Sequence, residues 1–298
     1  MRKNAKAVRA VSVIQQELDN IDAEYKARKK ELQKELKKAK AVEAIIYTAK
    51  APKYQVFYDK DCSLSIVDGN SKLGTGIGVV NTIAGDGLLT KKDGSVLCNV
   101  SGTCKGCCDS CKYDCYAIKS QLCNNTNLVH WARNTILATE HLEQFVAEFE
   151  QLIRAEGNKQ KKQKSFPIYR WHALGEVPSV DYMREVFKMA EKFPEKQFYI
   201  YTKRFAWLEQ VYEEYDCKLP SNLSVLVSMW KDKDGRWNYD NKYSFAEFIY
   251  DDGTDEEIAK LPHCPATDKN GHKTGVKCIG CKQCVYATKG YRKAVYPH

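Results

Sequence analysis

The sequence lacks an apolar run long enough to cross a lipid bilayer, which requires about 20 consecutive apolar residues. The longest runs, such as Leu223 to Trp230, are far shorter. The start, Met1-Arg-Lys-Asn-Ala-Lys, is basic but leads into a charged segment and has no apolar signal-peptide core. We therefore expect a cytoplasmic protein that makes no membrane contact.

The sequence also lacks a phosphate-binding P-loop, whose pattern is G-x4-G-K-[S/T]. The Gly-rich run from Gly69 to Gly78 does not fit this pattern. Glycines in such a run mark bends. We therefore expect this run to form turns in a hairpin-rich region and not a nucleotide site.

Cysteine is plentiful, with 13 residues in a chain of 298, and most of them fall into two groups. Cytosolic thiols are kept reduced, so clustered cysteines in a chain without an export signal indicate metal ligands and not disulfides. Thiolates that recur every two to four residues can converge on one metal centre. The first group is Cys104, Cys107, Cys108, Cys111 and Cys115, and the second is Cys264, Cys278, Cys281 and Cys284.

The first group allows more than one ligand set. Cys104-x3-Cys108-x2-Cys111 has the spacing with which radical S-adenosylmethionine enzymes hold a [4Fe–4S] cluster by three thiolates, leaving one iron open to the cofactor. Those enzymes usually carry an aromatic residue before the third cysteine, where this chain has Ser110. The ending Cys115-Tyr-Ala is also familiar in such motifs and would make Cys115 the last ligand. The other two ligands would then be Cys111 and Cys107, and the gap between Cys111 and Cys115 would be one residue too long.

Four thiolates of the first group could instead hold a structural zinc ion or a fully ligated cluster. In that arrangement either Cys107 or Cys108 joins Cys104, Cys111 and Cys115. We favour an iron–sulfur centre here and keep zinc as the alternative.

The second group has a more specific spacing. Cys278-x2-Cys281-x2-Cys284 is the close triplet of ferredoxin-like clusters, and Cys264, followed by proline, supplies a distant fourth thiolate. A four-thiolate zinc site is the competitor, but it is usually built from two separate C-x2-C pairs. The spacing therefore favours a second [4Fe–4S] cluster.

The middle of the chain alternates strand and helix patterns with short connections, which predicts a parallel sheet. Apolar spacing also predicts one long helix over residues 127–154. In parallel sheets, residues that serve chemistry follow the carboxyl ends of strands. The predicted strands are 166–172, 198–202 and 223–229, and the predicted helices between them are 181–192 and 205–215.

Polar residues follow the first two of these strands. Gly175-Glu176 resembles the Gly-Gly-Glu-Pro-like motif that helps bind the cofactor's amino group in radical S-adenosylmethionine barrels. The alternative is a turn glycine followed by an acid at a helix N-terminus, where the helix dipole favours it. His172 could equally be a buried histidine, and Lys203 and Arg204 could hold an anion or be surface charge. We take His172, Gly175 and Glu176 as candidate cofactor-binding residues.

The N-terminal segment predicts a basic amphipathic helix from about Val8 to Ile46, with apolar residues at spacings of three, four and seven. Residues 1–40 hold twelve Lys or Arg against six Asp or Glu, so they contribute most of the net charge of +9. Such a helix could contact nucleic acid, anionic lipid or a partner helix. It could equally be a solvated helix that packs on the main body or associates with itself.

Several of these segments resemble one family, that of the phage and mobile-element protein called gene product 88. The matching segments are Gly69-Asn-Ser-Lys-Leu, Thr103-Cys104 to Cys115-Tyr-Ala, Trp131-Ala-Arg-Asn134, Arg170-Trp-His172 to Glu176, Phe198-Tyr-Ile-Tyr-Thr-Lys203 and the tail from His263-Cys264-Pro. The family usually shows His-x-Ser-Gly-Asp where this chain has His172-Ala-Leu-Gly175-Glu176. The resemblance implies a relative of radical S-adenosylmethionine barrels with two cysteine centres, and it assigns no activity.

We therefore expect an α/β protein with an incomplete (β/α) barrel resembling the radical S-adenosylmethionine fold. The expected regions are a basic helical extension (1–50), a Gly-rich strand and hairpin region (51–100), an α/β core with the first cysteine group (101–260) and a C-terminal cysteine module (261–298).

The expected function is that of a radical S-adenosylmethionine-like enzyme of a phage or mobile element, with two [4Fe–4S] clusters and an unknown substrate. The alternative is a non-enzymatic iron–sulfur or zinc protein that binds nucleic acid or a protein partner.

Overall fold

The computed structural model describes residues 13–16, 18–33, 35–36, 52–91, 93–107, 111, 115–123, 125–154, 165–232, 234–270 and 272–296. The chain divides into two compact units, Met1–Ala51 and Pro52–His298. In the first unit, every described residue from 13 to 36 is helical, as the apolar spacing predicts. The rest of the helix predicted over 8–46 lies outside the described residues.

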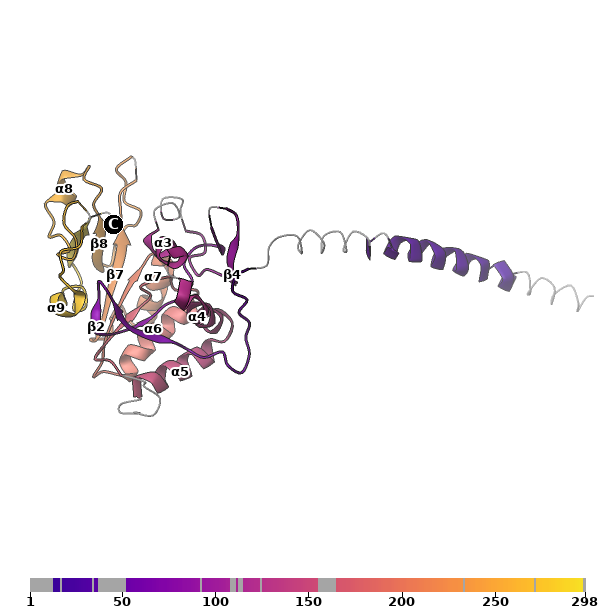
Figure 1. The fold of residues 1–298 in the computed structure, drawn as a ribbon, viewed down its shortest axis with the longest axis horizontal. Helices are drawn as coiled ribbons and strands as arrows, with labels where there is room; N and C mark the ends of the chain where they lie inside the picture. Colours follow the sequence, from indigo (N-terminus) through magenta and orange to yellow (C-terminus); the bar gives the residue numbers. More distant parts are fainter. Residues whose placement is uncertain are drawn as a thin grey trace, which may run out of the picture. The chain divides into compact units, whose positions relative to one another are not determined.

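The second unit is built on a seven-stranded sheet in the order β1-β2-β5-β6-β7-β8-β9 (Figure 1). β1 pairs antiparallel with β2, and every other neighbouring pair in this sheet is parallel. From β2 to β9 the spatial order is also the order along the chain. The strands are β1 (Ile66–Asn70), β2 (Gly74–Val80), β5 (Ile168–Trp171), β6 (Gln197–Thr202), β7 (Leu223–Met229), β8 (Ala246–Tyr250) and β9 (Arg292–Val295).

A separate two-stranded sheet and several helices complete this unit. β3 (Leu88–Thr90) pairs antiparallel with β4 (Val96–Ser101). The helices are α3 (Tyr116–Cys123), the 3-10 helix η1 (Asn125–Asn127), α4 (Leu128–Glu140), α5 (Leu142–Arg154), α6 (Val180–Lys192), α7 (Phe205–Glu214), α8 (Glu256–Ala259) and α9 (Cys278–Cys281). Among the described residues, no helix is both long enough and apolar enough to span a membrane.

The two faces of the main sheet are covered by different parts of the chain. Helices α4 to α7 lie on one side of the sheet, and the C-terminal segment with α8 and α9 lies on the other (Figure 1). Successive side chains of β5 point to opposite faces of the sheet. Tyr169 and Trp171 belong to the core on the helix side. Ile168 packs with Cys278 and Ile279 of the C-terminal segment. The C-terminal cysteine region is therefore part of the sheet's own packing.

The predicted α/β class and the central strand–helix alternation are confirmed. The sheet is open, with β1 and β9 as its edges, and the described residues show no pairing that closes it into a barrel. The single helix predicted over 127–154 is wrong, since α4 ends at Glu140 and α5 begins at Leu142. His141 interrupts it with φ −135° and stacks on Tyr58 with ring centroids 3.6 Å apart. Neither Gly nor Pro marks this break, so the apolar spacing could not reveal it.

The expectation for the Gly-rich run was only partly correct. A turn does follow β1, but the glycines from Gly74 to Gly78 form β2, a strand inside the sheet. A Cβ on Gly78 would lie 2.6 Å from Phe166 and 2.8 Å from Tyr169, and one on Gly74 would lie 2.7 Å from Ile279. These glycines therefore give large side chains room against the strand. The sequence patterns also missed β8 and β9.

Replacing Gly78 by alanine should destabilise the second unit by about 1–3 kcal/mol, because the added methyl group overpacks the site between Phe166 and Tyr169. The matched control is Gly87→Ala, where an added Cβ would meet open space. Urea unfolding of both variants measures the difference. Equal stability of Gly78→Ala and the parent protein would contradict this packing role.

Candidate functional site

The first cysteine group lies on the loop between β4 and α3, at the carboxyl end of β2. The backbone N–H of Thr103 donates to the carbonyl of Ile83 at 2.9 Å, and that of Cys104 donates to the carbonyl of Gly85 at 2.9 Å. Ile83 and Gly85 follow β2 directly, so these bonds hold the loop over the strand end. Cys104, Cys107, Cys111 and Cys115 are half-buried, and Cys108 lies outside the described residues.

A chain of hydrogen bonds connects this loop to the end of β5. The Thr82 hydroxyl lies 3.0 Å from the Thr103 hydroxyl and 3.4 Å from Nδ1 of His172. The Thr103 hydroxyl donates to the carbonyl of Ile83 at 3.3 Å and accepts from the N–H of Glu176 at 2.9 Å. When the Thr103 proton lies on the Ile83 carbonyl, Thr82 donates to Thr103 and accepts from Nδ1 of His172. In that arrangement Nε2 of His172 is an acceptor.

His172 is buried in a strained conformation. It is 3% exposed, has a positive φ of 50°, and its Nε2 has no hydrogen-bond partner among the described residues. Burial, together with the charge of Arg170, lowers the pKa of His172 from 6.5 to about 3. The residue is therefore neutral at ordinary pH and acts through hydrogen bonding. This agrees with the buried-histidine alternative and adds a link to the cysteine loop.

The carboxylate of Glu176 joins the ends of β5 and β6. It accepts from the Thr202 hydroxyl, from the N–H of Lys203 and from the N–H of Val177, each at 2.9 Å. A carboxylate has about four acceptor positions, so one position remains for a further donor. The predicted contact of Glu176 with a cofactor amino group stays a prediction, and it has that one position to use.

Gly175 and Arg204 complete the support of the loop. Gly175 has φ +83°, and a Cβ there would overlap the Thr82 hydroxyl, so a side chain would break the hydrogen-bond chain. The Arg204 guanidinium donates to the carbonyls of Thr103 at 2.9 Å, Lys105 at 2.6 Å and Val177 at 3.2 Å. Sequence reasoning offered Arg204 as an anion ligand, but the structure uses it to fasten the cysteine loop to the end of β6. Its carbonyl partners carry no sequence signal.

The first group combines low solvent access with negative neighbours. Burial, aided by nearby Glu176, Cys115 and Cys111, raises the pKa of Cys104 from 9.0 to about 12. Lys203 lies beside the same groups: burial lowers its pKa, but Cys111 and Glu176 outweigh that effect and raise it overall. The structure thus brings Cys104, Cys111 and Cys115 into one electrostatic environment with a lysine beside them.

The second group consists of four cysteines from two segments, on the face of the sheet opposite α4 to α7. The N–H groups of Cys278 and Ile279 donate to the carbonyls of Lys72 at 3.1 Å and Leu73 at 2.9 Å, which docks α9 on the β1–β2 turn. The N–H of Cys264 donates to the carbonyl of Ala294 in β9 at 2.8 Å. Cys264 is buried, whereas the three cysteines from 278 to 284 are half-buried.

The four cysteines influence one another electrostatically. Burial raises the pKa of Cys278, and Cys264 and Cys281 raise it further. Burial also raises the pKa of Cys284 to about 11, with Cys264 and Cys278 adding to the effect. Cys264, Cys278, Cys281 and Cys284 therefore lie near one another, and their role as metal ligands stays a prediction.

Three cations surround the second group. Lys72 and Arg170 act on Cys278, and the buried Lys293 acts on Cys284. Arg170 stacks on the ring of Tyr201 with its Cζ 4.7 Å from the ring centroid, and its buried Nε has no hydrogen-bond partner among the described residues. Sequence reasoning missed these residues, because strand alternation alone does not say which face meets the cysteines.

Within the described part of the chain, no three His, Cys, Asp or Glu side chains lie in an arrangement that could hold a metal ion. Neighbouring cysteines help to raise the pKa of Cys104, Cys278 and Cys284, yet the sulfurs do not converge as ligands. Protonated thiols have no electrostatic reason to converge, because metal binding and thiol deprotonation occur together. The donor chemistry fits a thiophilic metal: four cysteines surrounded by cations match the negative charge of a thiolate-ligated centre.

The buried His172 should make folding sensitive to acid. Its pKa in the folded state lies below its ordinary value, so the unfolded chain binds more protons between about pH 3 and 6.5. Stability therefore decreases as the pH is lowered through this window. His172→Asn, which tolerates a positive φ, should remove roughly 1 kcal/mol of this loss per pH unit below about pH 6. Urea unfolding at about pH 7 and about pH 5 measures the slope. An unchanged slope in the variant would contradict a neutral buried His172.

Comparisons with known proteins give one match. The sequence model described as gene product 88 matches residues 64–290, close to the range expected from the quoted segments. A comparison with curated proteins and a comparison with solved structures each found no match. Because the family model covers more than half of the chain and includes both cysteine groups, the protein belongs to the gene product 88 family.

Proposed function

We propose that this chain is an iron–sulfur protein of a phage or mobile element, with two cysteine-ligated [4Fe–4S] centres and a radical S-adenosylmethionine-like activity. The observation that carries the proposal is the location of the first cysteine group. It lies over the carboxyl end of β2, the first strand of a parallel series whose spatial order is its chain order, and against the Gly175-Glu176 turn after β5. In parallel sheets this edge is where ligands bind.

In this proposal, three thiolates of the first group hold a cluster with one open iron. Cys104, Cys111 and Cys115 share one electrostatic environment. Cys107 and Cys108 remain candidates for the same centre. When bound there, S-adenosylmethionine supplies a radical after reductive cleavage, which is the chemistry of the enzymes that this spacing resembles.

The chain's own residues have supporting roles at this centre. Glu176 keeps one acceptor position for a cofactor amino group, and Lys203, which lies near Cys111 and Glu176, is a cation suited to a carboxylate. Tyr116, directly after Cys115, donates its hydroxyl proton to the carbonyl of Ala173. This bond ties the end of the cysteine loop to the loop that carries Glu176, so the ligands and the cofactor contacts would move together.

The second group would hold an auxiliary centre. Four thiolates bring several negative charges into a poorly solvated place, which is costly unless cations compensate them. Lys72, Arg170 and Lys293 provide that compensation. Arg170 lies on β5, the strand that also leads to His172 and Glu176. The two centres would therefore share β5 as a common support.

One observation favours the alternative, a non-enzymatic metal protein that binds nucleic acid or a protein. Three protein donors already occupy the Glu176 carboxylate, which suits a purely structural role. The first group also has enough cysteines for a closed four-thiolate site. In that case both centres would be fully ligated, and the basic N-terminal helix would be the binding element.

Metal analysis of anaerobically purified protein tests the two-centre proposal. We expect about eight iron atoms and about eight sulfides per chain. Cys284→Ser should lose about half of this iron, because it removes one ligand of the second centre only. The matched control, Cys217→Ser, changes an exposed cysteine outside both groups and should retain all of it. Zinc in place of iron would overturn the proposal.

Electron paramagnetic resonance of the reduced Cys284→Ser variant tests the open iron. With the second centre removed, S-adenosylmethionine should change the spectrum of the remaining cluster, because its amino and carboxylate groups would ligate the open iron. Cys111→Ser in the same background should abolish both the signal and the response. A strong cluster signal that does not respond to the cofactor would favour two closed centres in a binding protein.

A further inference from the structure

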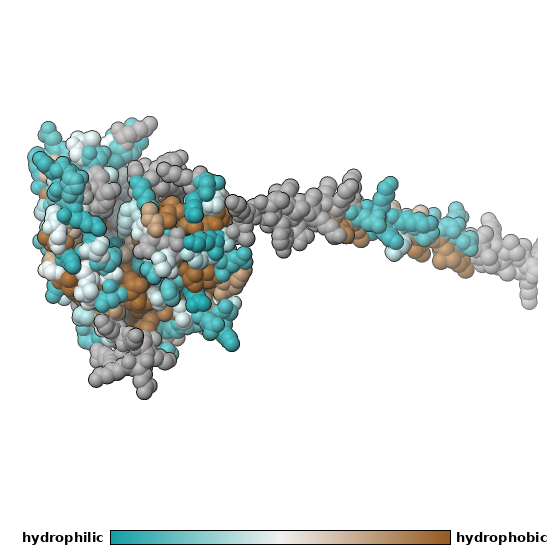
Figure 2. All heavy atoms as spheres, viewed as in Figure 1, coloured by the Kyte–Doolittle hydropathy of each residue, from teal (hydrophilic) through white to brown (hydrophobic). Residues whose placement is uncertain are grey.

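The N-terminal helix exposes an apolar stripe that packs on no other described residue of its own unit. The exposed fractions of its large apolar side chains lie between 49% and 63%. Figure 2 shows brown, hydrophobic patches along one edge of this helix and teal, hydrophilic residues along the other. Helices of this length gain most of their stability by burying such a face. The stripe consists of Val13, Ile14, Leu18, Ile21, Tyr25, Leu32 and Leu36.

The stripe has the spacing of a coiled coil. Ile14, Leu18, Ile21, Tyr25 and Leu32 follow at intervals of four, three, four and seven residues. A repeat that averages 3.5 residues keeps one seam of a helix against a partner helix. In heptad terms, Leu18, Tyr25 and Leu32 occupy a positions, and Ile14 and Ile21 occupy d positions.

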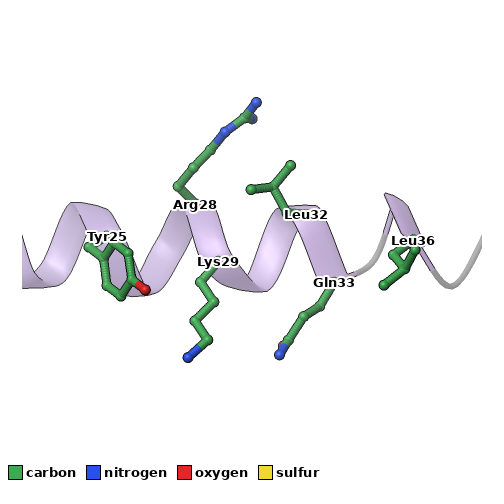
Figure 3. A pocket seen from close by; sticks show the side chains of 6 residues that line it. All are labelled: Tyr25, Arg28, Lys29, Leu32, Gln33 and Leu36. Atoms are coloured by element: carbon green, nitrogen blue, oxygen red, sulfur yellow. The ribbon is translucent and has the colours of Figure 1, made fainter.

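Charged residues interrupt and flank this seam. Arg28 and Glu35 occupy the next d positions, and Asp22 and Lys29 flank the seam at e positions. Figure 3 shows the side chains around a shallow hollow of this helix: Arg28 projects to one side, Lys29 and Gln33 project to the other, and Tyr25 and Leu36 lie between them. These charges decide which partner and which orientation fit.

We propose that this helix pairs with the same helix of a second copy of the chain as an antiparallel coiled coil, with Ile21 packed on Leu32 and Tyr25 on Arg28 of the other copy. In a parallel pair, d positions face their own equivalents, so Arg28 would face Arg28 and Glu35 would face Glu35. Like charges opposite each other in a seam are destabilising. A parallel pair would therefore be destabilised by like-charge repulsion at two layers of the seam.

The antiparallel pair removes both of those like-charge contacts and adds an attraction at the Arg28 layer. Its layers place a positions against d positions, so the Arg28 guanidinium lies over the Tyr25 ring of the second copy, a favourable cation–aromatic contact. Along one flank, e positions face e positions, and Asp22 meets Lys29 twice because of the two-fold symmetry. The fit is therefore both apolar, through Ile21 and Leu32, and electrostatic.

Two pairs oppose this arrangement, since Glu35 would lie against the apolar Leu18 of the second copy and Glu24 would face Glu31 along the other flank. Glu31 already has a partner, because Arg28 Nη1 lies 2.9 Å from its Oε2 in the same helix. Arg28 therefore neutralises part of that charge next to the seam. A shift of the pairing by one heptad would place Asp22 against Asp22 and Glu24 against Glu24, so charge also selects the register.

Sedimentation equilibrium of the full chain tests the proposal. The parent protein should be a dimer. Ile21→Asp should make it monomeric, and Asp22→Lys should raise the dissociation constant by about tenfold, because two attractive pairs become repulsive. Lys29→Asp added to Asp22→Lys should restore the dissociation constant to within about threefold of the parent value. The matched control, Asp19→Lys, makes the same charge change away from the seam and should have little effect.

Each other outcome contradicts a defined part of the proposal. A monomeric parent protein would overturn self-pairing. In a parallel dimer, position 22 does not meet Lys29, so Asp22→Lys would leave the dissociation constant unchanged or lower it. Circular dichroism of each variant shows whether its helix content is retained.

A photo-crosslinking residue at position 21 tests the orientation directly, even if a charge variant unfolds. p-Benzoylphenylalanine at this position of the full chain should crosslink to a peptide around Leu32 of the second copy. A crosslink between two peptides around position 21 would overturn the antiparallel orientation. A crosslink into residues 52–298 would overturn the coiled coil itself.

Discussion

The arrangement at the strand ends depends on one buried carboxylate. Glu176 is 8% exposed and would be unstable there without donors, since a buried charge must be hydrogen-bonded or paired. Its three donors come from the turn after β5 and from the end of β6. Its own N–H is bonded to Thr103, next to Cys104. The position of the first cysteine group is therefore set by the same residue that joins two neighbouring strands.

The order of the strands explains how two cysteine groups share one sheet. When parallel strands follow the order of the chain, crossovers of one hand place their helices on the same face. That face is occupied by α4 to α7, which leaves the other face to the C-terminal segment. The segment brings the second cysteine group against β5 and β6, while the first lies at the carboxyl ends of β2 and β5. Both groups therefore take their positions from the sheet.

Burial raises the pKa of Cys104 in the first group and of Cys278 and Cys284 in the second, and cations lie near both groups. The half-buried cysteines and the buried Lys293 fit a chain whose final packing is completed when thiolates form. Because ligand deprotonation and metal binding are coupled, metal affinity would contribute to the stability of the loop after β4 and of the segment that carries α9. The proposed metal centres would therefore be structural as well as functional.

The sequence by itself determined the two cysteine groups, the strand–helix alternation from β5 to β7, and the turn at Gly175-Glu176, because each rests on local spacing or local propensity. Tertiary structure alone decided that Gly74–Val80 is a strand, that His141 ends a helix, and that Arg204 holds the cysteine loop. Those outcomes depend on partners far away in the chain. Phe166 and Tyr169 lie against Gly78, Tyr58 stacks on His141, and the carbonyl of Thr103 accepts from Arg204. A glycine or an arginine carries no local sign of such a partner.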